Sequence, residues 1–186
     1  MSTRGAIVKT SDQGKTFVGR YHHWDSYPDG LGKTLVEAYY GFFKKDLKKM
    51  LKLLCDDHPA GWSTINNADF SKEPGYCENG FATEGPTEGP KCYCHGGRKQ
   101  DESIITEKDA SDCGCEYVYA FDEKENKLYV LSSYTEDDDG GSRRKMIGRF
   151  GMGDPDAIWK PIKLIDLNHE MELAMEQMAE EEAVAE

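Results

Sequence analysis

Two parts of the chain alternate hydrophobic and polar side chains with the period of two that is typical of β-strands. Residues 3–10 and 15–24 are rich in β-branched and aromatic residues and are separated by Ser-Asp-Gln-Gly. Residues 116–122 and 127–133 flank Glu-Lys-Glu-Asn and alternate more clearly. We therefore predict two antiparallel hairpins, each closed by a short polar turn.

A different period appears between the two hairpins, where hydrophobic residues recur at three- and four-residue steps. The residues in this pattern are Leu35, Tyr39, Phe43, Leu47, Met50, Leu51 and Leu54, with lysines at the positions between them. This spacing predicts a long amphipathic helix, which Gly41 could divide in two. The predicted fold class is therefore α+β, with a small antiparallel sheet from two hairpins packed on a long helix.

The end of the chain predicts an acidic helix. Residues 163–186 contain one lysine and eight acidic residues, and hydrophobic residues at three-four spacing run through them: Leu164, Leu167, Met171, Ala174 and Met178. Such a stripe can dock on the core or pair with a second copy to form a homodimer, and we favour docking. We divide the chain into an α+β domain of residues 1–162 and an acidic C-terminal helix of residues 163–186.

Residues 56–115 form an insertion that is rich in glycine and proline and poor in hydrophobic clusters, so it needs an added constraint to become ordered. It contains Cys92-Tyr-Cys94-His95 and, seventeen residues after His95, Asp112-Cys113-Gly-Cys115. Thiolate and imidazole are preferred zinc ligands. We expect a structural zinc held by Cys92, Cys94, Cys113 and Cys115, with His95 and Cys77 as alternates. The alternative is a set of free buried thiols, or a disulfide if the protein meets an oxidant.

A second group of candidate residues lies between the first hairpin and the helix, in Tyr21-His-His-Trp-Asp-Ser-Tyr-Pro-Asp-Gly-Leu-Gly32. Imidazoles, a carboxylate and phenols at the end of a strand can supply acids, bases and hydrogen-bond donors to one site. The candidate ligand-binding residues are Arg4, Arg20, His22, His23, Trp24, Asp25, Tyr27, Gly30 and Gly32. Among them, His23, Asp25 and Tyr27 are the catalytic candidates, with His23 as acid or base and Asp25 orienting it. The alternative is a structural strand end in which Asp25 caps a turn.

The same segment, together with Thr3-Arg4-Gly5, resembles a family of small, largely uncharacterised bacteriophage and microbial proteins with the pattern T-R-G … Y-N-H-[FW]-D-[SG]-Y-P-x-G-x-G. The resemblance covers about the first 36 residues. His23, Trp24, Asp25, Tyr27, Pro28, Gly30 and Gly32 match motif positions, whereas His22 replaces the usual Asn. The resemblance implies a phage or microbial setting, with the host cytosol as the place of action.

Charge narrows the classes of function. The net charge of −12 makes direct nucleic-acid binding an unexpected main activity. No apolar run approaches the roughly 18 residues that span a bilayer, and the N-terminus lacks a signal-peptide core, so we expect a cytoplasmic protein with reduced thiols.

We expect an acidic, zinc-stabilised interaction protein that modulates or inhibits a host macromolecule. The alternatives are an enzyme or a nucleotide- or metabolite-binding protein that uses His22, His23, Asp25 and Tyr27, and a structural component of a viral particle.

Overall fold

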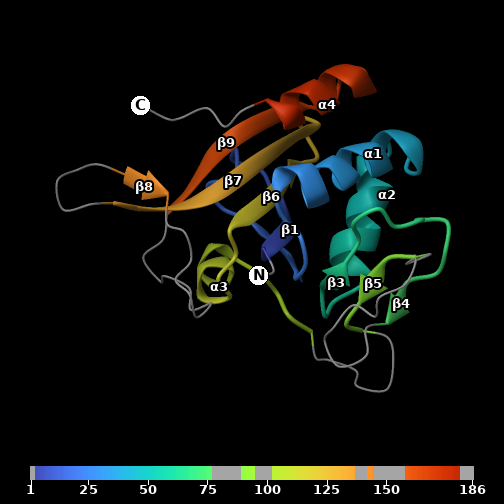
Figure 1. Ribbon diagram of the computed structural model, residues 1–186, viewed down its shortest axis with the longest axis horizontal. Helices are drawn as coiled ribbons and strands as arrows, with labels where there is room; N and C mark the ends of the chain where they lie inside the picture. Colours follow the sequence, from blue (N-terminus) through green and yellow to red (C-terminus); the bar gives the residue numbers. More distant parts are fainter. Residues whose placement is uncertain (1–2, 77–88, 95–101, 137–141, 145–157, 181–186) are drawn as a thin grey trace.

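The strands assemble into one mixed sheet in a computed structural model that describes residues 3–76, 89–94, 102–136, 142–144 and 158–180 (Figure 1). The strand order is β4-β5-β3-β2-β1-β6-β7-β8, and β9 also pairs with β7. The strands are β1 (Gly5–Thr10), β2 (Val18–His22), β3 (Trp62–Thr64), β4 (Gly75–Tyr76), β5 (Lys91–Cys92), β6 (Tyr117–Asp122), β7 (Lys127–Glu136), β8 (Ser142–Arg144) and β9 (Ile158–Asp166).

The two sequence-local strand pairs lie side by side in this sheet. Strand β1 pairs antiparallel with β2, and β6 pairs antiparallel with β7. The two pairs are joined by a parallel pairing of β1 with β6, in which Gly5 lies opposite Tyr117. The α+β class is confirmed, but the sheet is mixed and extends further on both sides than the small antiparallel sheet that we predicted.

A single long helix is not confirmed, because the helical region is divided after Gly41, the residue at which we considered a division. Segment η1 (Pro28–Gly32) leads into α1 (Lys33–Gly41), and after a break α2 (Leu47–Leu51) continues as η2 (Lys52–Asp56). The break contains Lys44 and Lys45, which both have positive φ angles of 52° and 66°. Asp46 then caps the new helix by accepting a hydrogen bond from the Lys49 amide at 2.9 Å. A local capping residue therefore restarts the helix in a new direction.

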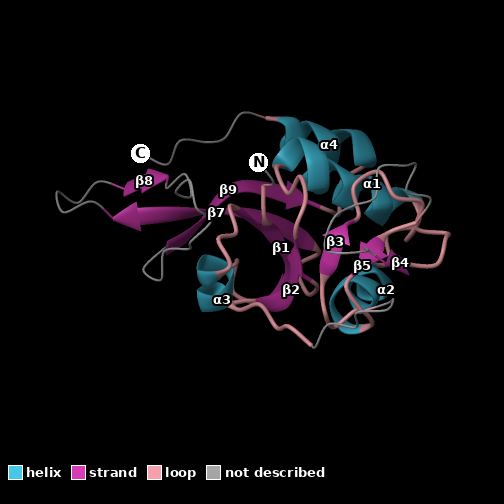
Figure 2. Ribbon diagram, turned by 60° about the horizontal axis from the view of Figure 1, so that its bottom comes forward, coloured by secondary structure: helices cyan, strands magenta, loops and turns pink. Residues whose placement is uncertain are grey.

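Alternate residues of the central strands separate two hydrophobic cores. Ile7 of β1 belongs to a large core with α1, α2 and α4 (Met171–Ala179), whereas its neighbours Ala6 and Val8 belong to a second core with α3 (Glu107–Asp112). Successive side chains of a strand point to opposite faces of a sheet. The large core therefore fills one face and α3 covers the other (Figure 2).

The C-terminal region begins as a strand rather than as a helix. Residue 163, where we placed the start of the acidic helix, lies inside β9, and Leu164 is 48% exposed on that strand. Helix α4 is shorter than expected and docks on the large core through Ala174 and Met178, which are buried. Within the described ranges, every helix is too short or too polar to cross a bilayer.

Candidate metal centre and the polar loop

His58, Cys92 and Cys94 form a cluster that could hold a metal ion. One ligand atom from each side chain lies within 4.8 Å of the other two. Two ligands that each stand about 2.3 Å from one ion are separated by less than about 4.6 Å, so small side-chain adjustments would let all three bind together. His58 and Cys92 are buried, and Cys94 is partly exposed.

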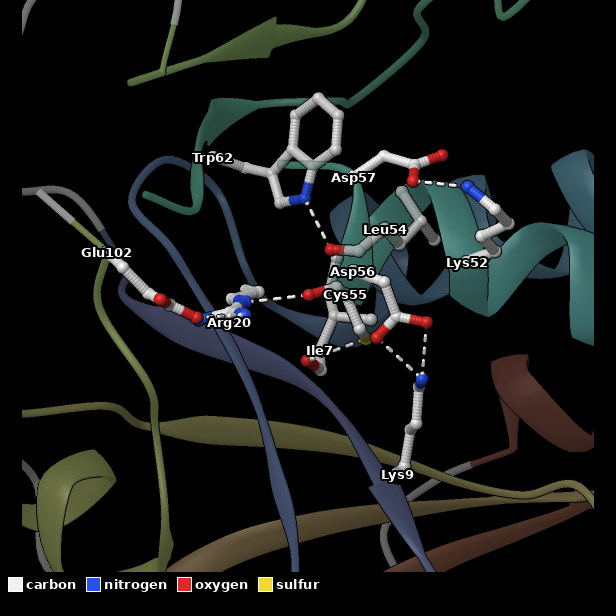
Figure 3. A network of polar contacts seen from close by, with 10 residues as sticks. All are labelled: Ile7, Lys9, Arg20, Lys52, Leu54, Cys55, Asp56, Asp57, Trp62 and Glu102. Carbon is white, nitrogen blue, oxygen red and sulfur yellow. Dashed lines mark hydrogen bonds and ion pairs between the residues drawn. The ribbon is translucent and has the colours of Figure 1, made fainter. Parts of the chain in front are cut away.

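A polar network fixes the end of η2, two residues before His58 (Figure 3). The indole Nε1 of Trp62 donates to the carbonyl of Leu54 at 2.8 Å, and Arg20 Nε donates to the carbonyl of Cys55 at 2.7 Å. Both carbonyls belong to the last turn of η2, where helical partners run out. The His58 ring also packs on Trp62 at a centroid distance of 4.6 Å. The end of η2 is therefore held against the sheet just before the first ligand.

The turn after His58 carries it to the cysteines. The Gly61 amide donates to the His58 carbonyl at 3.1 Å, and the Gly61 carbonyl accepts from the Tyr93 amide at 3.0 Å. Gly61 has φ +80°, and a Cβ there would lie 2.8 Å from the Tyr21 carbonyl, so this position requires glycine. Cys94 Sγ accepts a hydrogen bond from the Ala60 amide at 3.3 Å, and this bond orients the sulfur.

Strand pairing brings the remaining ligand into place. Cys92 of β5 lies opposite Trp62 of β3 in the antiparallel pair, so the residue that packs on His58 is also the strand neighbour of Cys92. Two sulfur donors and one imidazole are a set that suits borderline and soft transition metals better than Ca²⁺ or Mg²⁺. The chain thus holds this donor set from two segments that are more than thirty residues apart.

Cys113 and Cys115 do not join this cluster. Cys92 is part of the large core, with Cys94 packed against it, whereas Cys115 is part of the second core, with Cys113 packed against it. The sheet lies between the two pairs, so the expected set of Cys92, Cys94, Cys113 and Cys115 does not converge. The alternates His95 and Cys77 lie outside the described residues.

Sequence reasoning did not identify His58 as a ligand. It lies between Asp57 and Pro59, more than thirty residues before Cys92, and the nearer Cys55 was not grouped with other cysteines by spacing. A local signal is the segment His58-Pro-Ala-Gly-Trp62, in which Pro and Gly indicate a turn after a helix. The pairing of β3 with β5 is what places this turn beside Cys94, and that pairing is not a local property.

His22, the first of the polar-loop candidates, has a structural position. It is fully buried, its Nδ1 lies 2.7 Å from Ser26 Oγ, and its Nε2 accepts from the Ile65 amide at 3.2 Å. Burial, with a smaller contribution from the adjacent His23, lowers the pKa of His22 to about 3. A neutral histidine whose two ring nitrogens are both hydrogen-bonded links the end of the strand to the loop. This role fits the alternative that the segment is a structural strand end.

Other loop candidates also serve the fold. Arg20 donates from Nη1 to the Ser103 carbonyl at 3.0 Å and forms an ion pair with Glu102 at 3.1 Å, in addition to its bond to Cys55. Asp25 has φ 53°, and its carbonyl accepts from the Leu31 amide at 3.1 Å. The bond from Leu31 closes the loop around Gly30, where a Cβ would lie 2.5 Å from the Asp25 carbonyl.

The remaining candidates point to different places. Tyr27 is 40% exposed and lines a cavity of about 300 Å³ with Lys163. Gly32 lies under α4, where a Cβ would meet Met178 Sδ at 2.7 Å. The hydrogen-bond partner of His23 is the Tyr21 hydroxyl, at 2.8 Å, instead of Asp25. Trp24 packs edge-on against His23 at 4.6 Å between ring centroids. The loop therefore does not gather His22, His23, Asp25 and Tyr27 into one site.

Comparisons with known proteins add no assignment. No family model matches the chain, and no curated protein and no solved structure matches it significantly. Any function must therefore be argued from the geometry above.

Proposed function

We propose that this chain is a zinc-stabilised interaction protein of a phage or microbial cytosol, which modulates a host macromolecule. The observation that carries the proposal is the cluster of His58, Cys92 and Cys94. Zinc accepts one imidazole and two thiolates readily, and it has no redox chemistry of its own in a reducing compartment. Bound there, it would tie the turn after η2 to β5.

A structural role for zinc suits the short strands at this end of the sheet. Strands β4 and β5 have two residues each, and β3 has three. Strands β2 and β3 share the residue pair His22 and Trp62, and the amides of His23 and Trp24 extend this link by donating to the carbonyls of Trp62 and Ser63. Such short pairings contribute little stability alone, and a metal that binds only the folded arrangement adds its binding free energy to that of folding.

The interaction role is supported by the charge of the chain and by the outer side of α4. Ala174 and Met178 dock the helix, while Glu172, Leu173 and Glu176 are exposed. An acidic surface with one hydrophobic residue suits a basic partner surface, because complementary charges increase the association rate and the specificity. A pull-down tests this role. It is supported if one partner is captured and is released both by about 0.5 M salt and by the double substitution Glu172→Gln/Glu176→Gln, because salt screens contacts between exposed charges.

Elemental analysis of the purified full chain tests the zinc proposal. We expect one zinc per chain, and a Co²⁺-substituted protein should show the intense charge-transfer absorption of thiolate ligation. His58→Ala, Cys92→Ser and Cys94→Ser should each weaken zinc affinity by about tenfold or more, in line with loss of one ligand. Cys55→Ser is the matched control, because Cys55 is buried, free and outside the cluster.

Two results would contradict the proposal. One is a folded chain, purified with zinc present throughout, that carries no metal. The other is zinc binding that Cys113→Ser abolishes and Cys92→Ser leaves intact, because that outcome would place the metal on the opposite face of the sheet.

A further inference from the structure

A cavity of about 220 Å³ lies between α1 and the loop that follows β3. Six of the residues that line it come from α1, its C-cap and this loop: Glu37, Ala38, Phe42, Ala68, Asp69 and Phe70. Pockets for drug-sized ligands start at about 300 Å³, so this cavity suits a single side chain better than a whole small molecule.

Hydrogen bonds hold the loop beside the helix. The Thr34 hydroxyl of α1 accepts from the Asn67 amide at 3.3 Å, which ties the two sides of the cavity together. Asp69 Oδ1 accepts from the amide and from the hydroxyl of Ser71 at 2.9 and 2.6 Å. These bonds fix the Asp69 carboxylate on the loop side of the cavity, while Glu37 lies on the helix side.

Apolar surface makes up the inner part of the cavity. Ala38 and Phe70 are buried, and Ala68 packs against the large core. Phe42 is 39% exposed, and its ring centroid lies 6.1 Å from that of Phe70. Lysine and arginine bury their aliphatic stems on such surface while the charged group stays near water. The lining therefore matches a long side chain with an apolar stem.

Two carboxylates make the cavity acidic. Glu37 is partly buried, and its carboxylate forms no hydrogen bond or ion pair with the described residues. Both bonds from Ser71 end on Oδ1 of Asp69, which leaves Oδ2 for another donor, and they lower the pKa of this carboxyl group. Lys49 Nζ lies 5.8 Å from the centroid of the Phe42 ring, so this ring already attracts a cation. The cavity therefore presents acceptors and an aromatic ring to a positively charged donor.

We propose that this cavity binds an arginine side chain of a partner protein, with Glu37 and Asp69 as acceptors and Phe42 as the stacking surface. The planar guanidinium donates to carboxylates in a fork and stacks on aromatic rings, whereas a lysine ammonium is a compact charge. The source is a partner protein because a chain of net charge −12 attracts basic protein surfaces. This inference rests on the proposed interaction role and names the chemistry of its partner, at a site that shares no residue with the metal cluster or with the outer side of α4.

The test is an NMR titration of the zinc-loaded full chain with capped tripeptides at pH 7 and constant ionic strength. The probes are acetyl-Gly-Arg-Gly-amide and the same peptide with lysine or with citrulline, which keeps the shape of arginine without its charge. We expect the arginine peptide to bind with a dissociation constant of about 1 mM and to shift the amide signals of residues 37–42 and 67–70. The lysine peptide should bind about threefold more weakly, and the citrulline peptide about tenfold more weakly.

Variants identify the groups that bind the peptide. Glu37→Gln and Asp69→Asn should each weaken the affinity for the arginine peptide by about fivefold, the upper range for a partly exposed ion pair. Phe42→Leu keeps an apolar side chain but removes the ring, so it should weaken binding by about threefold. Glu123→Gln is the matched control, because Glu123 is exposed in the turn between β6 and β7, and it should leave the affinity within about 1.5-fold. Lys49→Gln should not weaken binding, because Lys49 is a competing cation.

The proposal is overturned if the arginine peptide does not bind saturably, or if the lysine or the citrulline peptide binds as tightly as it does. It is also overturned if Glu123→Gln weakens binding as much as Glu37→Gln does, or if Lys49→Gln weakens binding. Free L-arginine that binds tenfold more tightly than the peptide would overturn it as well, because the cavity would then serve the amino acid.

The two roles can fail separately. Glu172→Gln/Glu176→Gln should retain peptide binding, because these residues lie outside the cavity. Peptide binding without a captured partner would contradict only the interaction role proposed above, and a captured partner without peptide binding would contradict only the arginine site.

Discussion

His22 illustrates how burial decides the role of one side chain. The fully buried ring keeps a pKa of about 3, whereas an unfolded chain binds the proton near the ordinary value of about 6.5. The unfolded state therefore binds more protons between these values, and stability falls as the pH decreases from about 6.5 towards 3. Above about pH 6.5 His22 is neutral in both the folded and the unfolded state, so the full stability is present there.

We predict that lowering the pH from 7 to 5 reduces the free energy of unfolding by about 2 kcal/mol through His22 alone. Urea unfolding of the wild type and of His22→Asn at both pH values measures this effect. The variant should be less stable than the wild type at pH 7 but should lose about 2 kcal/mol less on acidification. Ser26→Ala, which removes the hydroxyl partner of Nδ1 and no titrating group, is the control and should keep the wild-type pH dependence. If the free energy of unfolding depends on pH equally in the wild type and in His22→Asn, His22 is not the source of the pH dependence.

At the scale of elements, a strand pairing could be predicted when its two strands were close together in the sequence. The pairings of β1 with β2 and of β6 with β7 are local, and alternation with short turns predicted them. The parallel pairing of β1 with β6 joins residues about a hundred positions apart and has no local pattern. Gly41 indicated the break between α1 and α2, and the capping residue Asp46 was a second signal that we overlooked.

The candidate site shows the same limit. Cysteine spacing correctly brought Cys92 and Cys94 together, because they are neighbours on one short segment. Spacing does not say on which face of a sheet a cysteine lies, and Cys113 and Cys115 lie on the other one. His58 could be recognised only once β3 and β5 were paired.

The attachment of η2 to the sheet gives a prediction at the same scale. Arg20 is buried and donates to the carbonyl of Cys55 (Figure 3). It also donates to the carbonyl of Ser103. Arg20→Met removes those donors and leaves two carbonyls without them, which should cost about 3 kcal/mol of stability. Lys9→Met is the matched control, because Lys9 is partly exposed and its ion pair with Asp56 should contribute less than about 1 kcal/mol. Urea unfolding at pH 7 measures both, and similar losses for the two variants would argue against a special role for Arg20.

Across the whole molecule, the two ends of the sheet differ in how they are held. Strands β6 and β7 share six residue pairs, and every residue of β6 is buried. At the other end, β3 and β5 share two pairs with a shift of register between them. Regions with few pairings open more easily than the central strands do. A metal at His58, Cys92 and Cys94 would stabilise the end of the sheet that contains β3 and β5, and it would leave the local stability of β6 and β7 unchanged.

We therefore predict that zinc slows amide hydrogen exchange unevenly. Adding zinc to chelator-treated protein should slow exchange by about tenfold or more in residues 58–64 and 91–94, since binding removes openings that separate the ligands. Exchange that occurs by local opening in residues 117–122 and 127–133 should change by less than about twofold, because those openings do not separate the ligands. Cys94→Ser should abolish the effect, and Cys113→Ser should preserve it. Uniform slowing along the whole chain would instead mean that the metal acts only on global unfolding, and slowing confined to residues 107–117 would move the metal to the second core.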